Sequence, residues 1–297
     1  MNTLRLFCTV ACGMFLPVVA WSQAKTTPSV SKQRQTPTNV YAAEGYRLVW
    51  SDEFDKPGSP DPKNWGYEEG FVRNEEAQWY QKENARVENG MLIIEARKER
   101  KLSPDYKPGS TDWKTARQFA EYTSSCLQSQ GKREFRYGRF EARARIDTRP
   151  GSWPAFWTLG ATGHWPMGGE IDILEYYRYG LHANTAWGAG GWKAKWDATE
   201  HPIGLLGGPD WGTQFHVWRM DWEEKAIRLY VDDQLLNETD VTQTVNENRE
   251  AGDAVNPFQQ PQYLLLNLAV GGQSGGDEKQ TRFPVRYEVD YVRVYQK

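Results

Sequence analysis

Short segments in which apolar and polar residues alternate recur from Tyr46 to Tyr295. Side chains of a β-strand point to opposite faces with a period of two, so this alternation is typical of half-buried strands. No long stretch shows the period of an amphipathic helix, and 27 Gly and 16 Pro residues supply many turns. We therefore expect an all-β fold of two packed antiparallel sheets. The clearest segments are residues 46–50, 91–97, 137–146, 217–222, 227–231, 263–270 and 287–295.

The two ends of this patterned region are expected to meet. Residues 46–50 and 287–295 are both rich in Val and aromatic side chains, so we predict that the first and last strands pair and close the domain. Three other segments, residues 105–118, 187–211 and 239–261, are longer than a hairpin needs. We expect them to be loops that wall a binding site.

The chain is expected to divide into three parts. Residues 1–24 combine Arg5, an apolar run and the small-residue sequence Ser22-Gln23-Ala24, which is the pattern of a cleaved export signal. The apolar run is shorter than the roughly 20 residues of a spanning helix, so we predict export to the periplasm, cell surface or exterior without a membrane span. Residues 25–44 are rich in Thr, Ser, Pro, Gln and Lys and are predicted to be a flexible linker. Residues 45–297 form the expected domain.

The overall composition narrows the class of partner. Lys plus Arg total 36 and Asp plus Glu total 39, giving a formal charge of −3 and no basic excess to attract nucleic acid or an anionic bilayer. Removal of the signal would leave Cys126 alone, without a partner for an intramolecular disulfide. We expect a monomer that is held together by its core and binds a neutral ligand.

Three acids stand close together in one predicted strand, residues 170–175. Glu170 and Asp172 share a face, but strict alternation would turn Glu175 away from them. All three can face one side only if an extra residue is absorbed, and we predict a β-bulge near Ile173-Leu174. A plain polar face is the alternative interpretation, but the flanking Gly168-Gly169 and the apolar residues of the other face indicate an interior strand, where like charges this close are costly unless something uses them.

Glycoside hydrolysis is a reaction that uses such a cluster, because it needs one ionised and one protonated carboxyl group flanking the anomeric carbon of a sugar. With Glu170 ionised as the nucleophile, Glu175 would be kept protonated by its negative neighbours and could donate to the leaving oxygen. Asp172 would orient Glu170 and share a proton with it. The 14 Trp, 15 Tyr and 11 Phe residues suit a polysaccharide, whose rings stack on aromatic side chains.

Trp153 and Trp157 stand just before the acidic strand. The strand reading places both of them, with Ala155, on one face. Their rings would floor a sugar-binding cleft, while the indole N–H groups find polar partners; packing in the core is the alternative.

Several motifs together resemble glycoside hydrolase family 16, particularly its laminarinase-like members and their agarase and endo-β-galactosidase relatives. These motifs fall in the family's order between Tyr46 and the end of the chain. They are residues 50–54 (WSDEF), 74–75 (NE), 137–143 (YGRFEAR), 153–157 (WPAFW), 170–175 (EIDILE), 267–272 (NLAVGG) and 289–295 (VDYVRVY).

The resemblance implies a concanavalin A-like β-jelly-roll sandwich with an open concave cleft, and retaining, endo-acting hydrolysis of β-linked glucans or galactans. It implies Glu170 as nucleophile, Asp172 as assisting acid and Glu175 as general acid/base, in agreement with the chemical argument. Asn74 and Glu75 resemble donor-side subsite residues of the family. We also count Trp187 among the predicted substrate-binding residues.

Two departures from the family pattern bear on the substrate. Ala186 stands where laminarinase-like members commonly have His, and His182 occupies a different position of the same segment. Residues 271–276 lack the Trp that often follows the Gly-Gly pair in the family's glucanases. Both changes weaken a β-1,3-glucan assignment. Galactose-containing chains, including poly-N-acetyllactosamine of animal glycans, are therefore rivals.

Other classes remain as alternatives. A non-catalytic jelly-roll lectin would share the sandwich, but lectin descent usually loses one of the paired acids. A transglycosylase would keep all three. The four His residues show no metal-ligand spacing, so no cofactor is expected to be required, although some relatives bind structural Ca²⁺, for which Asp290 is a candidate.

Overall fold

The computed structural model describes residues 40–208, 210–247 and 256–297. All of them belong to one compact unit, Gln33–Lys297. The predicted signal peptide, residues 1–24, and the linker up to residue 39 lie outside the described residues. Within the described part of the chain, no helix is long and apolar enough to cross a membrane.

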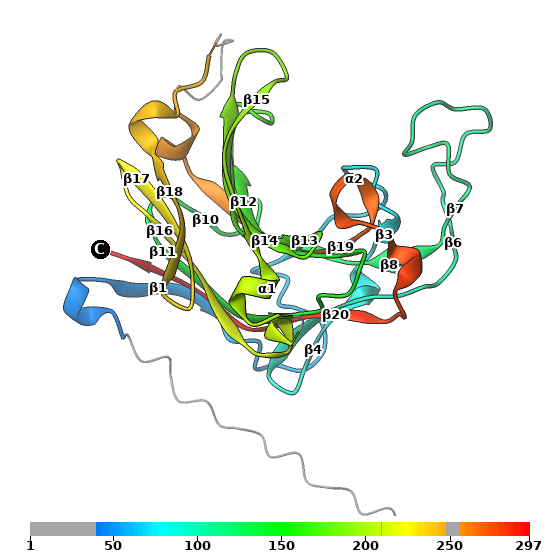
Figure 1. Cartoon of the computed structure of the whole chain (residues 1–297), viewed down its shortest axis with the longest axis horizontal. Coiled ribbons are helices and arrows are strands. Elements are labelled where there is room, and N and C mark those ends of the chain that lie inside the picture. The colour runs from blue at the N-terminus through cyan, green and yellow to red at the C-terminus, as the bar shows by residue number, and fades with distance from the viewer. Residues whose placement is uncertain (1–39, 209, 248–255) are drawn as a thin grey trace, which may run out of the picture. The chain divides into compact units, whose positions relative to one another are not determined.

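Two large antiparallel sheets dominate the described residues, which confirms the predicted all-β sandwich (Figure 1). Sheet A has the order β18-β17-β16-β11-β20-β5-β4, with β1 also pairing with β20. Its strands are β1 (Arg47–Asp52), β4 (Ala85–Glu88), β5 (Met91–Ala96), β11 (Gly138–Ile146), β16 (His216–Trp222), β17 (Ala226–Val231), β18 (Gln234–Asp240) and β20 (Val285–Gln296).

Sheet B has the order β15-β14-β13-β12-β19-β9-β2, with β10 also pairing with β19. Its strands are β2 (Gly66–Tyr67), β9 (Cys126–Gln128), β10 (Glu134–Phe135), β12 (Ser152–Gly160), β13 (Glu170–Tyr177), β14 (Gly180–Gly188), β15 (Ala194–Pro202) and β19 (Gln262–Val270).

Short elements complete the described fold. Two small sheets pair β3 (Gln78–Tyr80) with β8 (Tyr122–Ser124) and β6 (Lys101–Leu102) with β7 (Phe119–Ala120). The helical segments are α1 (Ile203–Leu206), α2 (Gly272–Gly275), η1 (Ala42–Glu44), η2 (Lys82–Asn84), η3 (Trp211–Thr213), η4 (Val241–Gln243), η5 (Pro257–Gln259) and η6 (Glu278–Gln280).

The main core fills the space between the facing sides of sheets A and B. Sheet A contributes Phe140, Trp218 and Tyr287, each fully buried, and sheet B contributes Phe156 and Ile173. Burial of such large apolar side chains supplies the main driving force for folding. The free thiol of Cys126 is buried in a smaller apolar cluster beneath the other side of sheet B.

The first and last strands pair as predicted. β1 runs antiparallel to β20 from Arg47 opposite Gln296 to Asp52 opposite Val292. The domain nevertheless begins earlier than expected, because Tyr41 packs its ring edge-on against Tyr295 at 5.1 Å and donates a hydrogen bond to Glu141. The prediction of a flexible linker through residue 44 is therefore wrong for residues 41–44.

Much of the expected loop of residues 187–211 is a β-strand, β15, which forms a hairpin with β14. β15 pairs along its whole length with β14, from Gly180 opposite Pro202 to Gly188 opposite Ala194. It forms the outermost strand of sheet B and is drawn in light green at the upper part of Figure 1. The prediction of a loop is wrong here, because β15 lacks the single apolar face by which strands were recognised.

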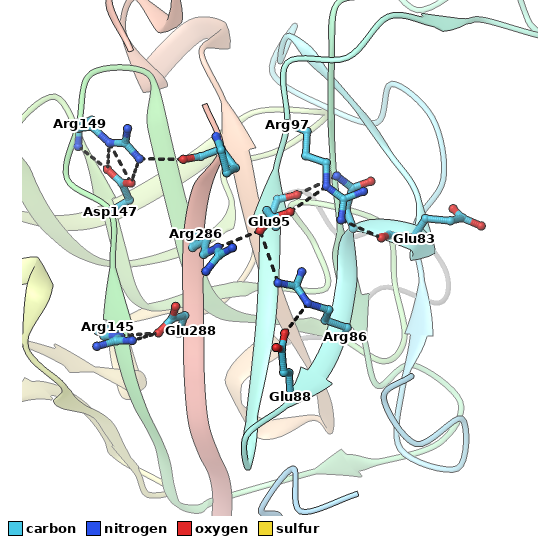
Figure 2. Close-up of polar contacts among 12 residues, drawn as sticks. Glu83, Arg86, Glu88, Glu95, Arg97, Arg145, Asp147, Arg149, Arg286 and Glu288 are labelled. Carbon is cyan, nitrogen blue, oxygen red and sulfur yellow. Dashed lines mark hydrogen bonds and ion pairs between the residues drawn. The ribbon is translucent and has the colours of Figure 1, made fainter. Parts of the chain in front are cut away.

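The outer side of sheet A carries ion pairs between neighbouring strands. Glu95 on β5 is bound by Arg97 at 2.9 Å, Arg286 at 2.8 Å and Arg86 at 3.5 Å (Figure 2). Arg145 on β11 likewise pairs with Glu288 on β20. Opposite charges on facing positions stabilise strand pairing modestly and keep this face polar.

Candidate active site

A cleft of about 990 Å³ lies over sheet B, on the side away from the main core. Side chains from β12, β13, β14, β15 and β19 line it, together with a turn at residues 73–76 and a loop that contains Trp165. Glu170 and Glu175 both face this cleft. The two glutamates predicted to be catalytic therefore line the same cleft.

The predicted β-bulge brings these side chains to the same side. Between β13 and β14 the register shifts between Asp172, opposite Asn184, and Glu175, opposite His182. The pairing with β12 shifts at the same place, where Phe156 faces Leu174 and Trp157 faces Asp172. One residue is thus absorbed at Ile173-Leu174, and the bulge predicted there is confirmed.

The register of β13, β14 and β15 arranges the cleft side chains in rows across the sheet. The row through Glu170 continues to Ala186 and then Trp196. The row through Asp172 continues to Asn184 and Ala198, and the row through Glu175 continues to His182 and Glu200. Neighbouring strands lie about 4.8 Å apart, so the rows extend the site outward from the three acids.

Glu170 accepts a hydrogen bond of 2.7 Å from the indole Nε1 of Trp165. Burial raises the pKa of Glu170, while the hydrogen bonds with Asp172 and Trp165 act in the opposite direction. An indole N–H can only donate, so this contact favours the ionised carboxylate. Trp165 was not predicted as a site residue; it is 42% exposed and lines the cleft.

Glu175 has a different environment. Trp153 donates its indole Nε1 hydrogen to Glu175 Oε1 at 2.8 Å. Burial, followed by the negative charge of Glu170, raises the pKa of Glu175 to about 8. A carboxyl group with this pKa is protonated at neutral pH and can act as a general acid.

Asp172 lies beneath the two glutamates and is 1% exposed. Burial, then the charges of Glu175 and Glu170, raise the pKa of Asp172 well above its ordinary value. Asn184 Nδ2 donates to Asp172 Oδ2 at 3.2 Å. A protonated Asp172 can donate to Glu170, which helps to keep the latter ionised.

Trp153 and Trp157 both line the cleft, on the face that the strand reading gave them. Trp157 also packs against Ala155, Tyr263 and Leu265 in the smaller cluster beneath the cleft. Its Nε1 donates to Asn267 Oδ1 at 2.6 Å. The ring is therefore fixed from below and presents one side to the cleft.

The turn of residues 73–76 forms one end of the cleft. Asn74 lines it as predicted, but the exposed side chain of Glu75 is not among the lining groups, and its Oε1 faces Gln273 Nε2 at 3.5 Å. Glu76 lines the cleft instead, is 2% exposed and accepts a hydrogen bond of 2.6 Å from Gln78. Consecutive left-handed residues, Asn74 at φ 55° and Glu75 at φ 52°, cause this change of direction.

Arg73, which the sequence did not single out, also lines the cleft. Its guanidinium lies 5.0 Å from the ring centroid of Trp157 and pairs with Glu68. A planar cation held between an aromatic ring and a carboxylate is well placed to donate to sugar hydroxyls.

The structure places Trp187 away from the substrate. Along β14 it shares its face with Leu181 and Ala183, and its ring packs in the main core edge-on to Phe258 at 6.5 Å. The prediction that it binds substrate is corrected, because odd-numbered residues of β14 point between the sheets. His182, on the cleft face, lies opposite Glu175 and stacks on Tyr177 at 3.7 Å.

The described residues contain no group of three or more His, Cys, Asp or Glu side chains that could hold a metal ion. Asp290, the candidate for structural Ca²⁺, accepts a hydrogen bond of 2.9 Å from Arg143.

Comparison with known proteins agrees with the geometry. The model of glycosyl hydrolases family 16 matches residues 73–293. A β-glucanase from Rhodothermus marinus is 39% identical over 270 residues, which cover 85% of this chain and 86% of that protein. A keratan-sulfate endo-1,4-β-galactosidase from Sphingobacterium multivorum is 28% identical, and the match covers 90% of this chain and 60% of that longer protein.

Solved structures add a third relative. A structure from work on endo-acting O-glycanases, with which prominent members of the human gut microbiota initiate mucin breakdown, superposes with a TM-score of 0.74. It is 34% identical in sequence, and the match covers 85% of this chain and 91% of that chain. With an acid-bearing bulged strand in a sandwich cleft and a family match over most of its length, the chain belongs to glycosyl hydrolases family 16 and is a glycoside hydrolase.

Proposed function

We propose that the protein is a retaining endo-β-glycosidase that works by double displacement, with Glu170 as nucleophile and Glu175 as general acid/base. The observation that carries this proposal is the pair of glutamates that one bulged strand presents to one cleft, with unequal environments. Burial raises the pKa of Glu170, but hydrogen bonds with Asp172 and Trp165 oppose this rise, whereas burial and the charge of Glu170 raise the pKa of Glu175 to about 8. Two carboxyl groups with separated protonation are what the reaction needs.

In the first step a Glu170 oxygen attacks the anomeric carbon, and the glycosidic C–O bond breaks. Glu175 gives its proton to the leaving oxygen, so the shortened chain departs as an alcohol. In the second step Glu175 removes a proton from water, whose oxygen attacks the same carbon and expels Glu170. Asp172 shares a proton with Glu170 and supports its ionised form.

The stereochemistry tests this mechanism directly. Two inversions restore the starting configuration, so proton NMR of the first product should show the β-anomer before mutarotation. An α-anomer as the first product would contradict the role of Glu170 as nucleophile, because it would require direct attack by water.

A β-linked glucan or galactan is the proposed substrate. Similarity to the Rhodothermus β-glucanase supports a glucan. Similarity to the mucin O-glycanase structure and the keratan-sulfate galactosidase supports a second candidate, a chain of the poly-N-acetyllactosamine type. Ala186, directly opposite Glu170, provides no polar side chain beside the nucleophile, in contrast to the His expected of laminarinase-like members.

A substrate panel separates these candidates. Laminarin, mixed-linkage glucan, agarose, porphyran, keratan and mucin glycans would be incubated with the protein, and products identified by mass. Endo-action predicts a ladder of oligosaccharides from one class of polymer. Ligand binding without any product would favour the lectin alternative, which the presence of all three acids in the site opposes. An added acceptor sugar would reveal transglycosylation.

We also propose export of the chain, with cleavage after Ala24, and action as a monomer. The sequence of residues 1–24 supports export. N-terminal sequencing of protein recovered from the medium or periplasm should begin at Lys25. Light scattering should give the mass of one chain; a first residue inside 1–24, or a dimer mass, would contradict the respective proposal.

A further inference from the structure

The outermost strand of sheet B carries two cleft-facing side chains that the proposed chemistry does not use. Trp196 and Glu200 on β15 both line the cleft. Trp196 is 49% exposed, and its neighbour on β14 in the same row is Ala186. A large aromatic ring that is half exposed on an edge strand contributes little to the core, so a role in binding is the natural explanation.

The opposite side of β15 is fixed to sheet A. Asp197 accepts a hydrogen bond of 2.9 Å from Thr239 on β18. His201 Nε2 lies 3.1 Å from the backbone oxygen of Leu236, and Asn237 Nδ2 reaches the Asp197 backbone oxygen at 3.3 Å. These contacts hold the strand by its odd-numbered residues. The even-numbered residues Trp196 and Glu200 are therefore presented to the cleft from a rigid support.

The position of β15 gives the distance from the reacting bond. β13 carries the acids, β14 is its neighbour and β15 is the next strand, so β15 lies two strand spacings away, roughly 10 Å. This leaves room for about two pyranose rings in a row across the strands. The turn with Asn74 lies on the other side of β13, against the end of β19, where Ala77 N donates to Val270 O and Gln273 N donates to Asn74 O. The family resemblance locates the donor side at this turn. β14 and β15 are thus left for the acceptor side.

We propose that Trp196 and Glu200 form an acceptor-side subsite for the second sugar beyond the cleaved bond, in which the pyranose stacks on the indole and its hydroxyls donate to the carboxylate. This inference rests on the proposed function and adds the direction and length of the bound chain. Stacking uses the apolar face of the ring and so suits a neutral glucose or galactose unit. With this subsite, the enzyme should prefer to cleave glycosidic bonds that have at least two sugars on their reducing-end side.

Cleavage of a reducing-end-labelled hexasaccharide tests the inference. Laminarihexaose and a poly-N-acetyllactosamine hexasaccharide, each labelled with ¹⁸O at the reducing end, would be treated with wild-type protein and Trp196→Ala, and the products sorted by mass. The wild type should release mainly two or more sugars from the labelled end. Trp196→Ala should move cleavage toward that end and lower kcat/KM by roughly tenfold, the value of one stacked aromatic contact.

Matched variants separate this effect from damage to the fold. Leu205→Ala removes another exposed apolar side chain, 84% exposed on α1 and absent from the cleft lining, and should keep the wild-type cleavage pattern. Trp196→Phe keeps an aromatic face and should recover most of the lost selectivity. Trp196→Ala should melt at the wild-type temperature, because its ring is outside the core clusters.

A binding measurement makes the test independent of turnover. In a Glu170→Gln background, calorimetry with the same hexasaccharides should show about tenfold weaker binding when Trp196→Ala is added. An unchanged cleavage pattern together with unchanged affinity would overturn the subsite, as would a shift of cleavage toward the unlabelled end. A wild-type protein that binds these chains through Trp196 but cleaves no polymer would overturn the proposed function and leave the subsite standing.

Discussion

The indole N–H of Trp153 donates a 2.8 Å hydrogen bond to Glu175, the carboxyl group proposed as general acid. Tyr177 lies against the same indole at 5.2 Å and stacks in turn on His182. Trp153, on the adjoining strand β12, therefore sets the orientation of Glu175. The other cleft tryptophan, Trp157, lies four residues further along β12. A donor to the carboxylate favours its ionised form and limits how far burial can raise its pKa.

Replacement of Trp153 by Phe should shift the pH dependence of activity. The variant keeps an aromatic ring but loses the N–H donor, so the pKa of Glu175 should rise above its value of about 8. The alkaline limb of kcat/KM reports the free enzyme's general acid and should move to higher pH by about one unit, the effect of one charge-assisted hydrogen bond. Measurement of kcat/KM between pH 5 and 10 would check this, and a shift to lower pH would contradict the assignment.

Glu170→Gln should abolish turnover while the fold is kept. The amide is nearly isosteric but cannot attack the anomeric carbon, so kcat should fall by about 10⁴-fold or more. Glu88→Gln, a change on the outer side of sheet A, provides the matched control and should keep wild-type kcat. Near-wild-type activity of Glu170→Gln, checked for purity by mass, would rule out the nucleophile role.

Arg117 should position the donor-side turn. Its guanidinium donates to the backbone oxygens of Glu76 at 2.7 Å and Glu75 at 3.1 Å and lies over Phe71 at 4.4 Å. From the opposite side the turn contacts Gly272, where an added Cβ would lie 2.7 Å from the Asn74 oxygen. Two left-handed residues in this turn cost about 1 kcal/mol or more each, so the turn needs both supports.

Arg117→Met should therefore raise KM several-fold for oligosaccharides that reach the turn, with a smaller change for short aryl glycosides. Arg149→Met is the control, because Arg149 also donates to two backbone oxygens, those of Arg282 and Pro284, but faces no part of the cleft. Equal effects of the two variants on every substrate would show that Arg117 acts only on stability.

Trp187→Ala should behave as a core mutation. The ring is 9% exposed and belongs to the main core, so its removal should cost about 3–5 kcal/mol of unfolding free energy. Urea unfolding followed by circular dichroism would measure this loss. The activity that remains below the unfolding transition should keep the wild-type KM; a raised KM with unchanged stability would restore the role first predicted for this residue.

Glu95→Gln should destabilise the protein at neutral pH and much less in acid. The carboxylate is 8% exposed and bound by three arginines, which lower its pKa despite burial. A folded pKa below the unfolded value of about 4.3 means that this contribution is present above that pH and is lost as pH falls through the folded pKa. The expected cost at pH 7 is about 1–3 kcal/mol. Glu88→Gln, with a half-exposed side chain, should cost less than about 1 kcal/mol.

The sequence was sufficient to predict strands with one apolar face. β5, β11, β16, β19 and β20 were all expected, because each buries alternate residues against the core. β15 was missed, since one of its faces lines the cleft and the other meets polar groups of β18, which leaves no apolar periodicity. Recognition of such a strand requires its partner, and partners are set by tertiary structure.

Within the site, the alternation of side chains between the two faces of a strand explains which site residues were predicted correctly and which were not. The acids, the bulge, Trp153 and Trp157 follow from counting residues along β12 and β13. Trp187 is an odd-numbered residue of β14 and could have been assigned to the core by the same count from Leu181 and Ala183. The exchange of Glu75 for Glu76 could not be predicted, because it depends on left-handed backbone angles in a turn.

The bulge at Ile173-Leu174 also sets how the strand tolerates changes in length. Because the extra residue is accommodated locally, the residues of β13 that follow it keep their orientation, including Glu175, which lies opposite His182 on β14. Removal of one of the two bulge residues would restore regular alternation in β13 and still leave Glu175 on the same side as Glu170. A single insertion elsewhere in β13 between them would turn Glu175 toward the core. By this count, β13 can lose one bulge residue and keep both glutamates on the cleft side, but it has little freedom to gain one.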